Sequence, residues 1–173
     1  MVELRSPDPS WHEAWLAMVA EFAGGHVDGS GVHRRTVDEL ADPEVFRAWV
    51  SGLAAQERGE DVPEGWVAAS LRWVTEGDEV VGTIQLRHEL NDFLLQEGGH
   101  IGYAVRPTAR RRGVATRALA LMLDECRARG IDPVLLTCDD DNVASARTIE
   151  TNGGVLEDVR NGKRRYWITV SDK

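Results

Sequence analysis

One segment near the middle of the chain restricts the possible folds more than any other. His100–Val105 is predicted to be a strand, which Pro107 stops. Val114–Arg129 has apolar residues at helical spacing and is closed by Gly130, and Val134–Cys138 is an apolar run of the β type. A strand, a helix and a second strand in this order predict a right-handed parallel crossover within one sheet.

The flanking sequence adds antiparallel strands and further helices. Two β-rich runs at 66–75 and 79–87 are separated by a short glycine-containing turn and predict a hairpin. A second hairpin is predicted around the Asn161-Gly162 turn. The other predicted elements are a strand at 2–5, a helix after a Ser10–Glu13 capping box, a helix that begins at Asp42-Pro43, and a helix at 142–151. Together they predict an α/β (α+β) fold with a mixed, mostly antiparallel central sheet and helices on both faces.

The length and charge of the chain limit what it can bind. With 173 residues, it suits a single domain over 1–173. The formal net charge of −9 argues against a nucleic-acid partner, because phosphate binding needs a basic surface, and it is compatible with a cationic small-molecule substrate. No apolar run approaches the roughly 20 residues of a membrane span, so we expect no membrane partner. Cys126 and Cys138 are interpreted as reduced thiols of a cytoplasmic protein.

A basic cluster interrupts this acidic background. Arg106 and the run Arg110–Arg112 lie directly before the helix predicted at 114–129. The first N–H groups of a helix have no intrahelical partner, and the helix dipole adds partial positive charge, so the segment predicts a phosphate site. Gly113 allows close backbone approach, and Thr116 adds a hydroxyl donor. The segment contains neither a Walker-type loop nor the glycine pattern of a dinucleotide-binding fold.

The same segment resembles a known family. Arg110-Arg-Arg-Gly-Val-Ala115 is similar to the Arg/Gln-x-x-Gly-x-Gly/Ala signature of the GNAT superfamily of N-acetyltransferases. Ile101–Pro107 resembles the strand that leads into this loop, and Asn142 and Ser145 match a later Asn-x-x-Ala/Ser pattern. The resemblance implies a GNAT-like acyl-CoA N-acyltransferase fold. The first 65 residues are consistent with that fold but not diagnostic.

The resemblance also implies acetyl-CoA as cosubstrate. Backbone groups of Ala104 and Val105 would pair with the pantetheine arm like an added strand, and Asn142 would contact the same arm. The pyrophosphate would lie on backbone N–H groups of the loop and the helix start. The implied cofactor-binding residues are Ala104, Val105, Arg110, Arg111, Arg112, Gly113, Val114, Ala115, Thr116, Asn142 and Ser145.

Three residues are candidates for the base that deprotonates the amine. An alkyl ammonium has a pKa of about 10.4, so a base should help at neutral pH, directly or through water. His100 begins the strand that should line the cleft, and Glu97 and His88 lie on or beside the loop that enters it. Each of the three could instead have a structural contact.

Three other features bear on the chemistry. Many family members have a Tyr that protonates the departing thiolate, and Ile149 replaces it here, so another residue, water or no acid serves that step. Cys138 is interpreted as a core thiol rather than a nucleophile. The adjacent residues Asp139–Asp141 lack the alternating spacing of a calcium loop, so no metal site is predicted.

We therefore expect an N-acetyltransferase that moves an acetyl group from acetyl-CoA to a primary amine of a small molecule, by direct attack in a ternary complex. The alternatives are a non-catalytic acyl-CoA-binding sensor and an enzyme that acetylates lysine or N-terminal amines of proteins. The sequence does not identify the acceptor. A homodimer through the terminal strands or helices is compatible with it.

Overall fold

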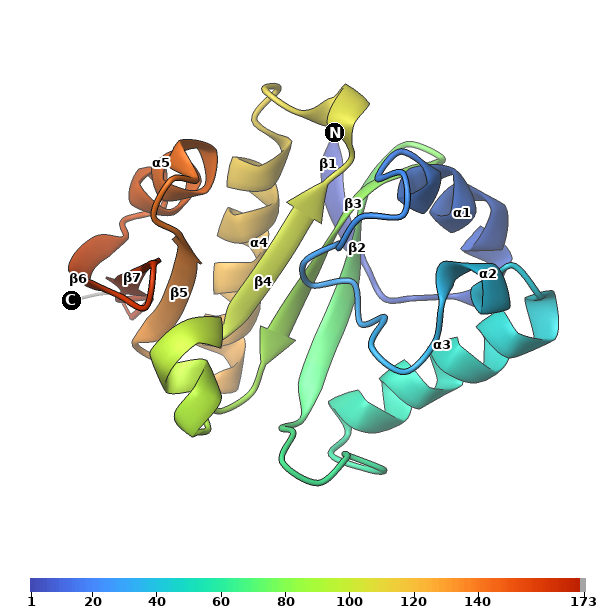
Figure 1. Cartoon of the computed structure of the whole chain (residues 1–173), viewed down its shortest axis with the longest axis horizontal. Helices are drawn as coiled ribbons and strands as arrows, with labels where there is room; N and C mark the ends of the chain where they lie inside the picture. Colours follow the sequence, from blue (N-terminus) through green and yellow to red (C-terminus); the bar gives the residue numbers. More distant parts are fainter. Residues whose placement is uncertain (172–173) are drawn as a thin grey trace.

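The computed structural model describes residues 1–171 and shows one twisted sheet with helices on both faces (Figure 1). The strands are β1 (Val2–Arg5), β2 (Ala69–Glu76), β3 (Glu79–Arg87), β4 (Ile101–Val105), β5 (Val134–Asp139), β6 (Val155–Arg160) and β7 (Lys163–Ile168). The α-helices are α1 (His12–Ala20), α2 (Val37–Leu40), α3 (Pro43–Glu57), α4 (Val114–Arg129) and α5 (Val143–Thr151). Short 3-10 turns lie at Pro9–Trp11 and Pro107–Ala109, and a π-helical turn lies at Leu94–Gly98.

The seven strands form one sheet in the order β1-β2-β3-β4-β5-β7-β6. Only the β4–β5 pair is parallel, and the other neighbours are antiparallel. This mixed, mostly antiparallel sheet confirms the fold class predicted from the crossover segment. No helix among residues 1–171 has both the length and the apolar character needed to cross a bilayer.

Two apolar cores cover the two faces of the sheet. On one face, α4 and α5 pack on the central strands, with Leu119, Met122 and Ile149 completely buried. On the other face, α1 and α3 pack on β2 and β3 around Trp15 and Trp73. Each side chain of this size contributes about 1.5–3 kcal/mol when it leaves water, so both helix layers are held to the sheet chiefly by burial.

Local signals placed most element boundaries correctly, with exceptions in the first half of the chain. The expected capping box at Ser10 is wrong, because Ser10 itself donates to Asp8, which caps the preceding 3-10 turn. A true capping box instead joins Thr36 and Glu39 at the start of α2. Neither α2 nor the π-helical turn at Leu94–Gly98 was predicted, since both lie in polar stretches without apolar periodicity.

The parallel strands β4 and β5 meet at one end and then diverge. Their only registered pair is Ile101 with Leu136, and α4 is visible between the separated strands in Figure 1. His100 joins the strands at the closed end, because its N–H donates to Leu135 O at 2.7 Å and its Nδ1 accepts from Leu135 N at 2.9 Å. A buried histidine side chain therefore makes one of the bonds that hold the two strands together before they separate.

The segment between α1 and α2 lies against the α1–α3 face of β3 and β4. Gly29 O accepts a hydrogen bond from Thr83 Oγ1 at 2.8 Å. A Cβ at Gly29 would lie 2.1 Å from Gly102 O, so the backbone of this segment touches the backbone of β4 directly. Gly29 also has φ of +64°, which favours glycine. Glycine at this position therefore fixes how closely the segment approaches the strand.

The close approach at Gly29 predicts that alanine substitution destabilises the protein much more at Gly29 than at Gly24. Gly24 has a similar φ of +78°, and an added Cβ would meet no atom within 4 Å. Gly24→Ala should therefore lower the free energy of unfolding by only about 1–2 kcal/mol, through backbone strain. Gly29→Ala adds a clash with β4 and should cost roughly 3 kcal/mol or more. Denaturant unfolding of both variants measures the difference. Equal destabilisation would contradict the described contact.

The buried His100 predicts a loss of stability in mild acid. Burial, with a smaller contribution from Arg87, lowers the pKa of His100 from 6.5 to about 4. Below pH 6.5 the unfolded chain gains a proton that the folded chain does not accept until about pH 4. The free energy of unfolding should therefore fall by about 3 kcal/mol over this interval.

Substitution tests this assignment. His100→Gln keeps a hydrogen-bond acceptor but does not titrate, so the variant should lose most of this acid sensitivity. His26→Gln, at an exposed histidine, is the matched control and should retain it. Denaturant midpoints between pH 7 and 4 measure the effect, and an unchanged pH profile in His100→Gln would disprove it.

Candidate active site

The divergence of β4 and β5 opens a groove of about 880 Å³. Its walls come from β4, the turn that follows it, the starts of α4 and α5, and the segment after α1. The groove brings together ten of the eleven residues that the resemblance implied for cofactor binding, namely Ala104, Val105, Arg110, Arg111, Gly113, Val114, Ala115, Thr116, Asn142 and Ser145. Arg112 is the exception, because it points away and pairs with Glu76 at 2.9 Å.

One end of the groove presents a run of free backbone donors. The N–H groups of residues 111–116 make no hydrogen bond to any residue in the described part of the chain, and no side chain caps α4. The turn before α4 places Arg111 at φ +58° and Gly113 at φ +77°, and this left-handed backbone shapes the loop around the helix start. Unpaired N–H groups and the positive end of a 16-residue helix suit an anion.

The arginines at this end have different tasks. Arg110 Nε donates to Val105 O at 2.9 Å, and its guanidinium lies over the Phe22 ring at 5.9 Å, so its side chain braces the turn. Arg111 and Arg147 are exposed and line the groove, which leaves their charges available to a ligand. Arg147, on α5, was not predicted, because no sequence pattern connects it with the loop before α4.

The β4 edge that faces the groove carries backbone groups that no strand pairs, although Val105 O already accepts from Arg110 Nε. Arg106 N donates to Val81 O on β3, and successive residues of a strand direct their backbone groups to opposite edges. Tyr103 and Val105 therefore face β5, whereas the backbone of Ala104 faces β3. The prediction that Ala104 and Val105 share this edge needs this correction, since the alternation pairs Val105 with Tyr103.

The opposite wall is the first turn of α5. Asn142 caps this helix, with its Oδ1 accepting from Ser145 N at 3.1 Å. Tyr103 reaches across from β4, and its hydroxyl lies 3.0 Å from Ser145 Oγ. Burial raises the pKa of Tyr103 to about 12, so the phenol keeps its proton at neutral pH. Ile149 is completely buried in the core and does not line the groove.

None of the three predicted bases lines the groove. His100 is engaged between β4 and β5, and burial keeps its pKa near 4. His88 Nε2 lies 2.8 Å from Ser70 Oγ, and burial lowers its pKa. Glu97 accepts from Asn161 Nδ2 at 3.3 Å. A catalytic role for any of them stays a prediction, and each has a structural contact.

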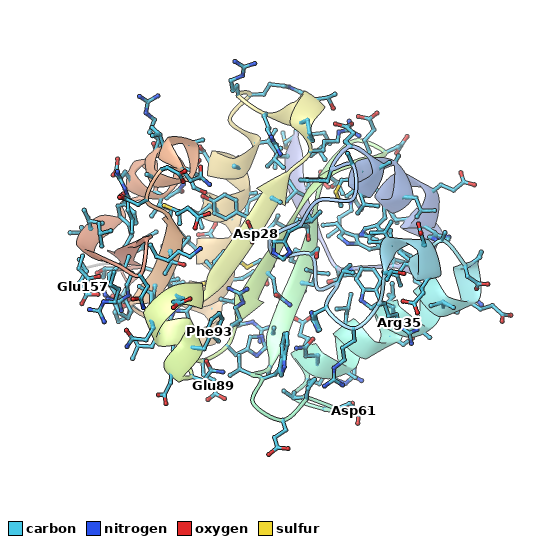
Figure 2. The ribbon with its side chains drawn as sticks, in the orientation of Figure 1. Asp28, Arg35, Asp61, Glu89, Phe93 and Glu157 are labelled. Carbon is cyan, nitrogen blue, oxygen red and sulfur yellow. The ribbon has the colours of Figure 1, made fainter. Side chains whose placement is uncertain are left out.

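The groove contains a histidine and a carboxylate that the sequence did not suggest. His26 and Asp28 line it beside Tyr103, with His26 Nε2 3.1 Å from Asp28 Oδ1, and both side chains are exposed. Figure 2 shows Asp28 lying over β4 near the middle of the molecule. Both belong to the polar stretch at 26–42, where no periodic pattern indicated which residues face the sheet.

The acidic run after β5 and the two cysteines have structural surroundings. Asp139 pairs with Lys163, and Asp140 pairs with Arg164. Among residues 1–171, no three or more His, Cys, Asp or Glu side chains are grouped so that they could hold a metal ion. Cys138 and Cys126 are free and buried, and burial raises the pKa of both thiols. Cys138 is therefore a core thiol, as predicted.

Comparisons with known proteins agree with this geometry. A model of the Acetyltransferase (GNAT) family matches residues 34–153. A comparison with curated protein sequences finds no match. Among solved structures, RimL, a ribosomal L7/L12 alpha-N-protein acetyltransferase in complex with coenzyme A, superposes with a TM-score of 0.66 at 19% identity, covering 97% of this chain and 93% of that chain.

Two other solved structures share the fold, with similar TM-scores and similarly low sequence identity. The microcin C7 self-immunity acetyltransferase MccE, in complex with acetyl-CoA and AMP, has a TM-score of 0.66 at 14% identity, with 97% and 92% of the two chains covered. The ribosomal-protein-S5-alanine acetyltransferase from Vibrio fischeri has a TM-score of 0.70 at 15% identity, with 99% and 94% covered. At these identities the structures establish a shared fold, whereas the family match spans more than half of the sequence. The chain therefore belongs to the GNAT family of acetyltransferases.

Proposed function

We propose that the protein transfers an acetyl group from acetyl-CoA to a primary amine of a small molecule, by direct attack within a ternary complex. The observation that carries the proposal is the run of unpaired N–H groups at residues 111–116, which opens onto the groove between the diverging strands. Several solved structures of the same fold contain coenzyme A or acetyl-CoA, which supports the choice of cosubstrate.

The groove offers contacts for the pyrophosphate and for the pantetheine arm of acetyl-CoA. The pyrophosphate would accept hydrogen bonds from the N–H groups of residues 111–116, with Arg111 and Arg147 supplying charge. The pantetheine arm would pair with the free edge of Tyr103 and Val105, as an added strand does. Bound in this way, acetyl-CoA supplies a thioester carbonyl close to β4, where a backbone N–H can polarise it.

His26 is our proposed proton acceptor. An alkyl ammonium has a pKa of about 10.4, so little of the amine is nucleophilic at neutral pH without a base. His26 lies in the groove wall, and its contact with Asp28 orients the ring. An exposed pair can also pass the proton to water.

Tyr103 is our proposed hydrogen-bond donor to the departing sulfur. Tyr103 lines the groove, whereas Ile149, which replaces the Tyr of many family members, is buried in the core and does not reach the groove. A thiolate with a pKa of about 8.5 leaves readily, so a hydrogen bond from a phenol that keeps its proton is sufficient assistance.

A second candidate function is acetylation of a protein N-terminus. It is favoured by the two ribosomal-protein acetyltransferases among the structures described above, although these share only the fold with this chain. Thiol release from acetyl-CoA, measured with a panel of small amines and a panel of peptides, separates the two functions. Turnover of peptides alone would replace the small-molecule proposal.

Gly113→Glu tests the anion end of the groove. The new carboxylate would repel a pyrophosphate and occupy its space, so calorimetry should detect no binding of acetyl-CoA. Gly130→Glu is the matched control, because Gly130 closes the other end of α4 at φ +71° and also has no atom within 4 Å. It should suffer the same backbone strain of about 1–2 kcal/mol and bind normally. Unchanged affinity in Gly113→Glu would remove the loop assignment.

His26→Gln tests the proton acceptor. Loss of a positioned base typically costs 10²–10⁴-fold, so kcat should fall by about 100-fold at pH 7 while the affinity for acetyl-CoA stays the same. Asp28→Asn should have a smaller effect in the same direction, because it removes only the orienting charge. A His26→Gln enzyme that retains wild-type kcat would show that water or another group accepts the proton.

A further inference from the structure

A second cavity, of about 330 Å³, shares none of the lining residues of the groove. It is enclosed by the loop around Trp66, the ends of β2 and β3, and the segment that begins at Asn91. Asn91 fixes two of these parts, because its Nδ2 donates to Gly65 O at 3.0 Å and its Oδ1 accepts from Leu94 N at 2.9 Å. The cavity is therefore a built feature of the fold rather than a gap between loops.

Arg87 brings an incompletely paired positive charge to this cavity. Its Nη1 donates to Gly98 O at 3.0 Å and Gly99 O at 3.3 Å, but no carboxylate in residues 1–171 lies within 4 Å of its guanidinium. Burial lowers its pKa, and the more distant Asp28 offsets this only in part. Nε and Nη2 make no hydrogen bond within the described chain. These two atoms form the edge of a guanidinium that binds a carboxylate with two parallel bonds.

Gln85 adds a second polar group without a partner. It lies two residues before Arg87 on the same face of β3 and lines the same cavity. Only 8% of the residue is exposed, yet its side-chain amide makes no hydrogen bond within residues 1–171. The amide is not among the fully buried polar atoms that lack a partner, so it is open to the cavity and available to a polar ligand beside the free edge of the guanidinium.

The outer walls of the cavity are apolar. Trp66 and Phe93 line it and are 48% and 64% exposed, and Trp66 is held by stacking on His33 at 4.4 Å. Figure 2 shows Phe93 beside the π-helical turn, on the same side of the sheet as Asp28. Exposed aromatic rings around a buried polar floor match a ligand with an anionic group at one end and an apolar group at the other.

The guanidinium of Arg87 also lies close to the inner end of the groove. A Cβ at Gly102 would lie 3.3 Å from Arg87 Nη2, and the next residue, Tyr103, lines the groove. Gly29 N would lie 3.4 Å from the same Cβ, so Arg87 and the Gly29 backbone share the surface of Gly102, one residue before the groove wall at Tyr103. This is where the proposed function places the thioester.

From this juxtaposition we propose that the cavity is the acceptor site, and that the acceptor is a small amine carrying a carboxylate and an apolar side chain, as an aromatic or aliphatic α-amino acid does. The proposal rests on the proposed function. Arg87 binds the carboxylate through Nε and Nη2, Gln85 binds a second polar atom, and the aromatic walls cover the side chain. The amine nitrogen then forms the new bond to the acetyl carbon, the sulfur takes the bond electrons, and the amine proton leaves to the base.

Matched pairs of amines test the proposal. Thiol release from acetyl-CoA is followed with L-phenylalanine against L-phenylalaninamide and 2-phenylethylamine, and with L-leucine against 3-methylbutylamine. Removing one partner of a buried, hydrogen-bonded charge pair typically weakens binding by about 30-fold or more, so kcat/KM should favour the carboxylate-bearing amines by at least about 30-fold. Equal or greater activity with the uncharged partners, or with peptides, would overturn the proposal.

Two variants separate recognition from folding. Arg87→Met should abolish the preference, because it should lower kcat/KM for the carboxylate-bearing amines far more than for their uncharged partners. Because Arg87 also supports two backbone carbonyls, Gln85→Leu is measured as well, and it should raise KM for the carboxylate-bearing amines without lowering Tm. Unchanged selectivity in both variants would disprove the site.

Calorimetry with acetyl-CoA distinguishes failure of the acceptor site from failure of the proposed acetyltransferase function. Tight binding and turnover without carboxylate preference would overturn the acceptor site alone. Absence of acetyl-CoA binding by the wild-type protein would overturn the proposed function and the acceptor site with it.

Discussion

The separation of two parallel strands governs the rest of this structure. Parallel neighbours in a sheet usually stay hydrogen-bonded along their length, but β4 and β5 share one registered pair and then part. His100 closes the joint, and the helices on one face fill the space beneath with Leu119 and Met122. The result is an interior strand with a free edge, which a water-exposed loop could not offer in so fixed a geometry.

Everything proposed for the groove follows from that edge and from the helix that starts beside it. In the proposed complex the backbone would provide most of the polar contacts, through the N–H groups of residues 111–116 and the β4 edge at Tyr103 and Val105. Backbone donors held by a helix and a sheet need little reorganisation when a ligand arrives, which favours affinity and rate. The side chains then adjust charge, with Arg111 and Arg147 at one end and His26 with Asp28 at the other.

The sequence predicted the fold well and brought the residues of the proposed anion end into one loop, because both depend on local signals. Pro107 stops a strand, Gly113 permits a left-handed turn, and Gly130 ends a helix, so residues close in sequence determine each boundary. The acceptor side could not be predicted in this way. His26, Asp28 and Arg87 come from separate segments, and only the contact of Gly29 with β4 brings the first two beside the groove. The same limit misassigned Ala104, whose edge depends on the register with β3.

The absence of shared walls between the two cavities has a kinetic consequence. On the proposed assignments, coenzyme and acceptor bind in two cavities that share no lining residue. A compulsory sequence of substrate addition has no steric basis in such an arrangement, and the free coenzyme can depart while the acetylated product is still held near Arg87. Initial-rate kinetics would then show random addition of the two substrates. Each dead-end complex would contain the product of one cavity together with the substrate of the other.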